Sequence, residues 1–93
     1  MLTYTISPYE RDYIEACYFE KNAKDSLLVM LVENKNIEVD SPIFERVYKE
    51  AVDSNIKFSA CFGAIADRYI PKSIKYTDAR IDFVDCALVV EEA

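Results

Sequence analysis

The sequence predicts an α+β fold that is mainly α: a long antiparallel helical hairpin with a small β element formed by the N-terminal and C-terminal segments. Two long stretches, each begun by a Ser-Pro pair, carry apolar residues at intervals of three and four, which is typical of helices. Both ends of the chain alternate apolar and polar residues, which is typical of strands. At 93 residues, the chain is predicted to form one domain, 1–93.

Residues 1–6 are predicted to form a short strand because Leu2, Tyr4 and Ile6 alternate with threonines. A helix over residues 8–34 follows. Ser7 and Pro8 supply the cap and the first helical residue, and Glu10 lies three residues after the cap. The apolar seam predicted for this helix consists of Tyr9, Tyr13, Ala16, Ala23, Leu27 and Met30, with Glu20 at the skipped turn.

A second helix is predicted over residues 42–70, between the pair Ser41-Pro42 and Pro71. Its predicted seam has alternating steps of four and three and consists of Phe44, Tyr48, Ala51, Asn55, Phe58, Phe62, Ile65 and Tyr69.

The connection between the two helices is predicted to be a short turn that places them antiparallel. Asn34, Lys35 and Asn36 end the first helix, and Asp40 precedes the second. If the turn centres between residues 37 and 38, facing residue numbers sum to about 75, which pairs Leu27 with Tyr48 and Glu20 with Asn55. The alternative is that Glu20 reaches solvent from the edge of the seam.

The C-terminal part is predicted to contain a polar connector at residues 72–80 and a strand or hairpin at residues 81–91. Its alternation slips at Val84 and Asp85, which indicates a bulge or a tight turn. We expect this segment to pair with residues 2–6. Two strands alone are marginal, so the pair is completed either by packing on the hairpin or by strands from another chain.

Composition disfavours several classes of function. A net charge of -6 argues against binding to nucleic acid or to an anionic membrane, and the lack of His removes the commonest general base and metal ligand. Most carboxylates of the helices have Lys or Arg three or four residues away, which favours a solvated face over a metal site. Cys17, Cys61 and Cys86 form no Cys-x-x-Cys pair, and we expect reduced, mostly buried thiols. The sequence predicts a cytoplasmic non-enzyme without a cofactor, and its longest apolar run, six residues, is too short for a membrane span.

An excess of aromatic residues, seven Tyr and five Phe, predicts contact with a protein partner or self-association, because such residues are enriched at interface centres. The alternative is that these residues complete the core of the single chain. The residues predicted to form the interface belong to the terminal segments and the first helix: Leu2, Tyr4, Ile6, Tyr18, Phe19, Ile81, Phe83, Leu88 and Val90.

The opening Tyr4-Thr5-Ile6-Ser7-Pro8-Tyr9-Glu10 with Asp12-Tyr13-Ile14-Glu15, the helix ending Ile65-Ala66-Asp67-Arg68-Tyr69, and the apolar terminal strand resemble small phage-encoded virion or assembly proteins. This resemblance implies a structural subunit that acts by surface contact and is incorporated into a particle. Residues 9–70 also resemble the two-helix accessory proteins of CXXX-repeat peptide modification systems, although the tryptophans of that family are absent here. That resemblance implies recognition of a peptide or of its modifying enzyme. A small enzyme or metal-binding protein is the third alternative.

Overall fold

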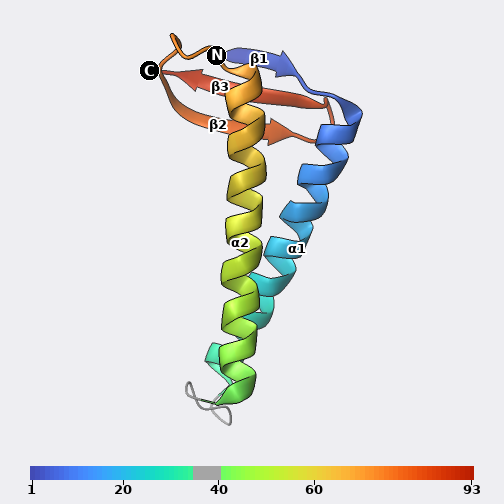
Figure 1. The fold of residues 1–93 in the computed structure, drawn as a ribbon, viewed down its shortest axis with the longest axis vertical. Coiled ribbons are helices and arrows are strands. Elements are labelled where there is room, and N and C mark those ends of the chain that lie inside the picture. The colour runs from blue at the N-terminus through green and yellow to red at the C-terminus, as the bar shows by residue number, and fades with distance from the viewer. Residues whose placement is uncertain (35–40) are drawn as a thin grey trace.

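The computed structural model describes residues 1–34 and 41–93. These residues form, in chain order, β1 (Leu2–Thr5), α1 (Pro8–Glu33), α2 (Pro42–Tyr69), β2 (Tyr76–Asp82) and β3 (Ala87–Glu92). Figure 1 shows the two helices side by side, with the sheet lying across the end of the hairpin where both termini meet. The predicted fold class is therefore confirmed.

Both helices begin at the predicted Ser-Pro pairs. At α1, the Ser7 hydroxyl accepts a hydrogen bond from the backbone N–H of Glu10 at 3.1 Å, and the Glu10 carboxylate accepts one from the N–H of Ser7 at 3.0 Å. At α2, the Ser41 hydroxyl accepts from the N–H of Phe44 at 3.3 Å, without a reciprocal bond because Phe44 has no side-chain acceptor. Local capping chemistry thus decides where each helix begins.

The helix ends agree with the predicted boundaries to within one residue. Helix α1 ends at Glu33 with Asn34 as its cap, and α2 ends at Tyr69 with Ile70 as its cap. The remainder of the predicted turn, Lys35, Asn36 and Asp40, and its centre between residues 37 and 38 lie outside the described residues.

The three described strands form an antiparallel sheet in the order β1-β3-β2. The predicted pairing of the terminal segments is confirmed, with Leu2 opposite Val90 and Tyr4 opposite Leu88. The predicted turn at Val84 and Asp85 is also confirmed, since the Asp82 carboxylate accepts hydrogen bonds from both N–H groups at 3.0 Å. Cys86 completes this turn with a φ of 54°, in the left-handed region.

The connector predicted at residues 72–80 was wrong over its second half, because β2 begins at Tyr76 rather than at residue 81. The pairing places Ala79 opposite Val90 and Ile81 opposite Leu88, so Ala79 and Ile81 lie on the inner face of the sheet. The alternate residues, Asp78, Arg80 and Asp82, are polar. An alternation carried by one small alanine among charged residues is a weak strand signal.

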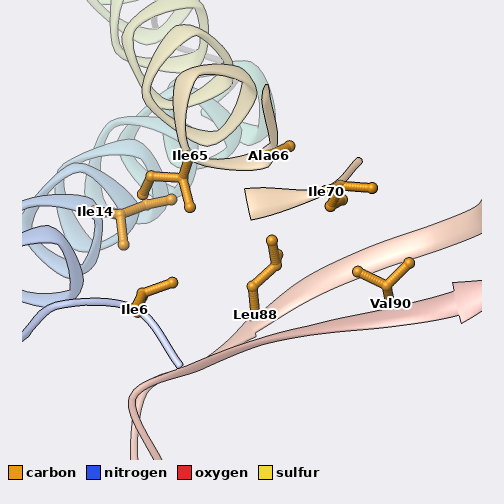
Figure 2. Close-up of a cluster of buried hydrophobic side chains, with 7 residues drawn as sticks. All are labelled: Ile6, Ile14, Ile65, Ala66, Ile70, Leu88 and Val90. Atoms are coloured by element: carbon orange, nitrogen blue, oxygen red, sulfur yellow. The ribbon is translucent and has the colours of Figure 1, made fainter. Parts of the chain in front are cut away.

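Buried residues from both ends of the chain and from both helices form one core beneath the sheet. Figure 2 shows Leu88 and Val90 of β3 pointing toward the residues contributed by α2 and its cap. The core cluster consists of Ile6, Ile14, Ile65, Ala66, Ile70, Leu88 and Val90. The terminal strands therefore pack on the hairpin, in agreement with the first of the two alternatives left open by the sequence.

The seam predicted for α1 was wrong, because its members are exposed rather than buried between the helices. Tyr9, Tyr13, Leu27 and Met30 are 79%, 48%, 40% and 66% exposed. The buried residues of α1 are instead Ile14 and Cys17, with half-buried residues including Leu28 further along. The helix carries two apolar stripes with similar spacing, and contact with the sheet selects the one that contains Ile14.

The seam predicted for α2 was partly right. Ala51 and Ile65 are buried as predicted, whereas Tyr48 is 54% exposed and Val47 is buried in its place. Five other members of the predicted seam are half-buried: Phe44, Asn55, Phe58, Phe62 and Tyr69.

The predicted pairing of Glu20 with Asn55 was also wrong. The Asn55 amide donates to the Asp25 carboxylate at 2.8 Å. Glu20 is exposed and pairs with Lys57 at 3.4 Å, in agreement with the alternative that it reaches solvent. The antiparallel arrangement is confirmed by these cross-helix contacts and by the ion pair of Lys24 with Glu50 at 3.1 Å. Within the described part of the chain, neither helix combines the length and apolar character needed to cross a membrane.

Candidate protein-binding site

An apolar groove of about 400 Å³ lies between the sheet and the two helices, and we call it the aromatic groove. Its walls come from all three parts of the fold: α1, α2, and the segment that contains β2 and the turn after it. The lining residues are Tyr18, Phe58, Phe62, Ala79, Arg80, Ile81 and Phe83.

Tyr18 is the centre of the aromatic contacts in this groove. Its ring centroid lies 5.5 Å from that of Phe83 and 5.9 Å from that of Phe58, and both pairs are tilted. Tilted pairs at this separation are favourable because the positive ring edge approaches the negative ring face. The ring centroid of Phe19 lies 6.0 Å from that of Tyr18, and the Phe19 side chain is 62% exposed. The cluster therefore joins both helices to the turn after β2 and extends to the surface.

The groove reaches the edge of the sheet. Ala79, Arg80 and Ile81 are consecutive residues of β2, and all three line it. Successive side chains of a strand point to opposite faces, so a groove that meets three in a row extends around the strand edge. Strand β2 is at the edge of the sheet order, where backbone N–H and C=O groups remain available for another strand.

The charges around β2 are predominantly negative. The Arg80 guanidinium lies 3.5 Å from the Glu91 carboxylate of the neighbouring strand, so its charge is balanced within the chain. Asp78 and Asp82 are on the same face of β2 as Arg80, and neither forms an ion pair with another described residue. The edge next to the groove thus has excess negative charge.

A row of exposed residues along α1 forms a second candidate surface, which we call the α1 stripe. Its members are all exposed and follow steps of four and three residues: Tyr9, Tyr13, Ala16, Ala23, Leu27 and Met30. Glu20 lies at the one polar position of this series and is paired with Lys57. A repeat of 3.5 residues along a straight helix matches the packing geometry of a second helix.

A smaller hollow of about 230 Å³ lies between the helices at their sheet end, and Tyr9 and Tyr13 of the α1 stripe line it together with Glu10, Cys61 and Arg68. The Glu10 side chain is only 10% exposed and accepts hydrogen bonds from Ser7, Arg68 and Tyr69. Desolvation alone raises the pKa of Glu10, but the bonds from Tyr69 and Ser7 and the charge of Arg68 outweigh it, and the net pKa is lowered. The hydrogen bond to Glu10 raises the pKa of Tyr69. These contacts tie the start of α1 to the end of α2.

Cys61, in the same hollow, has a raised pKa because of desolvation and the neighbouring Cys17 thiol. A raised pKa keeps a thiol protonated near neutral pH and lowers its nucleophilicity. All three cysteines are unpaired. Among residues 1–34 and 41–93, no cluster of three or more Cys, Asp or Glu residues has the arrangement of a metal site.

The predicted interface residues fall into three groups. Tyr18, Ile81 and Phe83 meet in the aromatic groove, and Phe19 borders it through its contact with Tyr18. Leu2 and Tyr4 are half-buried and pack against the core. Three predicted interface residues belong to the core of the chain and present no surface to a partner, which corrects the prediction for them: Ile6, Leu88 and Val90.

Four groove residues were missed by sequence reasoning. Phe58 and Phe62 were assigned to the seam between the helices, and they do lie on that side of α2. Ala79 and Arg80 were assigned to a connector. The period-two alternation of Ala79, Ile81 and Phe83 is the sequence signal that indicates a strand containing Ala79 and Arg80.

Comparison with protein-family models, with curated proteins and with solved structures gives no match. The described residues define a two-helix antiparallel hairpin capped by a three-stranded antiparallel sheet, with an apolar groove where helices and sheet meet.

Proposed function

We propose that this chain is a non-enzymatic protein–protein interaction subunit that works within a larger assembly. The observation that carries the proposal is the exposure of the α1 stripe. Tyr9 and Met30, at its two ends, are 79% and 66% exposed, and the stripe extends over most of a 26-residue helix. An extended apolar surface is typical of a protein contact site, because leaving it in water costs free energy.

A helix of another protein chain is the partner that this stripe fits best. Its spacing of 3.5 residues keeps the apolar side chains on one line along a helix of about 39 Å. The small residues Ala16 and Ala23 permit close approach, whereas Tyr13 and Leu27 provide larger contacts. Repetition of one such contact is the simplest way to build a particle from identical subunits.

The proposed setting is a structural or assembly component of a phage-like particle, formed in the cytoplasm where the three thiols stay reduced. The second candidate function is an accessory protein that recognises a peptide for a modifying enzyme. The aromatic groove favours this candidate, because it is open at a strand edge and lined by Tyr18, Phe58 and Phe83.

The mass of the protein in solution tests the proposal. We expect the unmodified chain to form species larger than a monomer, and the double variant Leu27→Lys, Met30→Lys to be monomeric, because both residues are exposed members of the α1 stripe. The control Ser59→Lys, Ser73→Lys adds the same charge at exposed positions off the stripe and is expected to associate like the unmodified chain. Sedimentation velocity over a range of concentrations measures the difference.

Two results would contradict the proposal. One is a monomer at every concentration that also shows no mixed complex with a helical partner protein. The other is equal association of the two double variants. A one-to-one complex with a peptide-modifying enzyme would instead select the accessory role.

A further inference from the structure

The outer edge of β2 is suited to accept an additional strand. At seven residues, β2 is the longest of the described strands, and its pairing with β3 is regular over residues 78–82. One side of β2 faces β3, and no described strand pairs with the other side. Alternate residues of such an edge direct N–H and C=O groups outward, where an extended peptide satisfies them by main-chain hydrogen bonds.

The two faces of β2 define which side chains an added strand needs. Ala79 and Ile81 face the core side and line the aromatic groove, whereas Asp78, Arg80 and Asp82 alternate with them. A strand added beside β2 continues the same alternation. One set of its side chains then lies over the groove, and the other set lies beside the charged face.

Apolar side chains suit the first set. The groove of about 400 Å³ is lined by four aromatic rings and has Arg80 as its one charged lining residue. Tyr18 is 38% exposed, so a side chain that enters from the strand edge reaches an aromatic surface. Aromatic and large aliphatic side chains gain most from such a contact.

Basic side chains suit the second set. Arg80 pairs with Glu91, which leaves Asp78 and Asp82 on that face without an ion pair to another described residue, and Asp82 also accepts the turn hydrogen bonds from Val84 and Asp85. Opposite charges directly across a strand pair are favourable, and like charges are unfavourable. The net charge of -6 attracts a basic segment over a distance.

We propose that the edge of β2 and the aromatic groove together bind an extended segment of a partner protein in which basic and apolar residues alternate. The inference rests on the proposed function, protein binding, and adds a second site with a defined class of partner. The groove takes the apolar residues, the strand edge takes the main chain, and Asp78 and Asp82 take the basic residues.

The probe is an acetylated and amidated peptide of sequence Lys-Val-Lys-Phe-Lys-Val, and the readout is NMR titration of the full-length protein. We expect shifts at β2 and in the aromatic groove, and none along the α1 stripe. A peptide with Glu in place of Lys, and one with the same composition but no alternation, are expected to bind about tenfold more weakly or not at all. Two further peptides carry N-methyl groups on one or the other of the two alternate sets of amides. Methylation of the set that faces β2 should abolish binding, and methylation of the other set should leave binding intact.

A pair of protein variants separates local recognition from the overall negative charge. Asp78→Lys is expected to weaken binding of the Lys peptide roughly threefold or more, because it places like charges across the strand pair. Asp53→Lys makes the same change in charge at an exposed position on α2 and is expected to bind the peptide like the unmodified protein.

Several outcomes would overturn the inference. They are the absence of binding, equal binding of the alternating and non-alternating peptides, or equal effects of the two Asp→Lys variants. Protection of the β2 amides by dimer formation without peptide would assign the edge to a second copy instead. The variant Leu27→Lys, Met30→Lys keeps β2 intact and should bind the peptide normally, so failure at the groove and failure of the α1 stripe give different results.

Discussion

Glu10 has three structural roles. Its carboxylate completes the capping box with Ser7, accepts a hydrogen bond from the Tyr69 hydroxyl and pairs with the Arg68 guanidinium. The first contact belongs to the start of α1, and the other two come from the end of α2. Tyr69 and Arg68 lie almost sixty residues from Glu10 in sequence. The residue that caps α1 therefore also holds the start of α1 against the end of α2.

Glu10 should make the stability of the protein depend on pH in a predictable direction. Its pKa is lowered in the folded state, so the ionised carboxylate stabilises the fold. This contribution is complete above the unfolded pKa of about 4.3 and is lost as the pH falls through the lower folded value. We expect Glu10→Gln to be less stable than the unmodified protein at pH 7 and to lose less stability on acidification. Urea unfolding at a series of pH values measures both effects.

The variant Glu33→Gln is the control for this experiment, since Glu33 is exposed at the far end of α1 and lies outside the Glu10 network. It removes one carboxylate without touching Ser7, Arg68 or Tyr69. If Glu10→Gln and Glu33→Gln gave the same dependence of unfolding free energy on pH, Glu10 would have no special role in the fold.

At the scale of the elements, α1 presents apolar residues on two faces, and only one of them is buried. The buried face contains Ile14, which is 0% exposed, and the exposed stripe contains Tyr13, which is 48% exposed. These neighbours belong to the two stripes that sequence spacing leaves equivalent. Ile14 is covered by the sheet and by α2, since Leu88 of β3 and Ile65 of α2 belong to the same buried cluster.

Substitution of these neighbours tests which face of α1 is buried. Ile14→Ala should lower the free energy of unfolding by about 2–5 kcal/mol, because it removes a fully buried side chain and leaves a cavity. Tyr13→Ala removes a larger but exposed side chain and should change it by no more than about 0.5 kcal/mol. Chemical denaturation of both variants is the measurement. A larger loss of stability for Tyr13→Ala than for Ile14→Ala would support the seam that spacing alone predicts.

At the scale of the whole molecule, the protein depends on contacts between its two ends. Strand β3 is central in the sheet, and its residues Leu88 and Val90 are 0% exposed. The longest dimension is 49 Å and the shortest is 17 Å, and the cluster of buried residues draws on both ends of the chain and on both helices. The main core therefore lies under the sheet, and we expect the chain to fold only when the terminal strands are in place.

A charge introduced at the centre of β3 should unfold the whole protein. Val90→Asp places a carboxylate in the core without a cation to pair with, at a cost of about 3–5 kcal/mol or more, which is comparable with the total stability of a small domain. Val84→Asp makes the same substitution in the turn, where the side chain is 90% exposed, and should leave stability unchanged. Circular dichroism and thermal unfolding compare the two variants. Retention of a native spectrum and melting temperature by Val90→Asp would show that the helices fold without the sheet.

Parts of the fold that depend on neighbours in sequence were predictable from the sequence. The Ser-Pro pairs and Glu10 determine the helix starts, because a cap satisfies backbone groups within three residues of itself. The alternation of Leu2, Tyr4 and Ile6 likewise determines a strand with one apolar face. Of the candidate site, Tyr18, Ile81 and Phe83 were predictable because aromatic and β-branched residues in a small acidic chain indicate a contact surface.

Only the tertiary structure decided which apolar face of α1 is buried, that β2 begins at Tyr76, and that the aromatic groove exists. The physical reason is that burial depends on elements distant in sequence. Apolar residues lie on two faces of α1, and packing against the sheet and α2 buries the face that contains Ile14. In the same way, Phe58 and Phe83 are 25 positions apart along the chain, and their shared contact with Tyr18 arises only when the sheet closes over the helices.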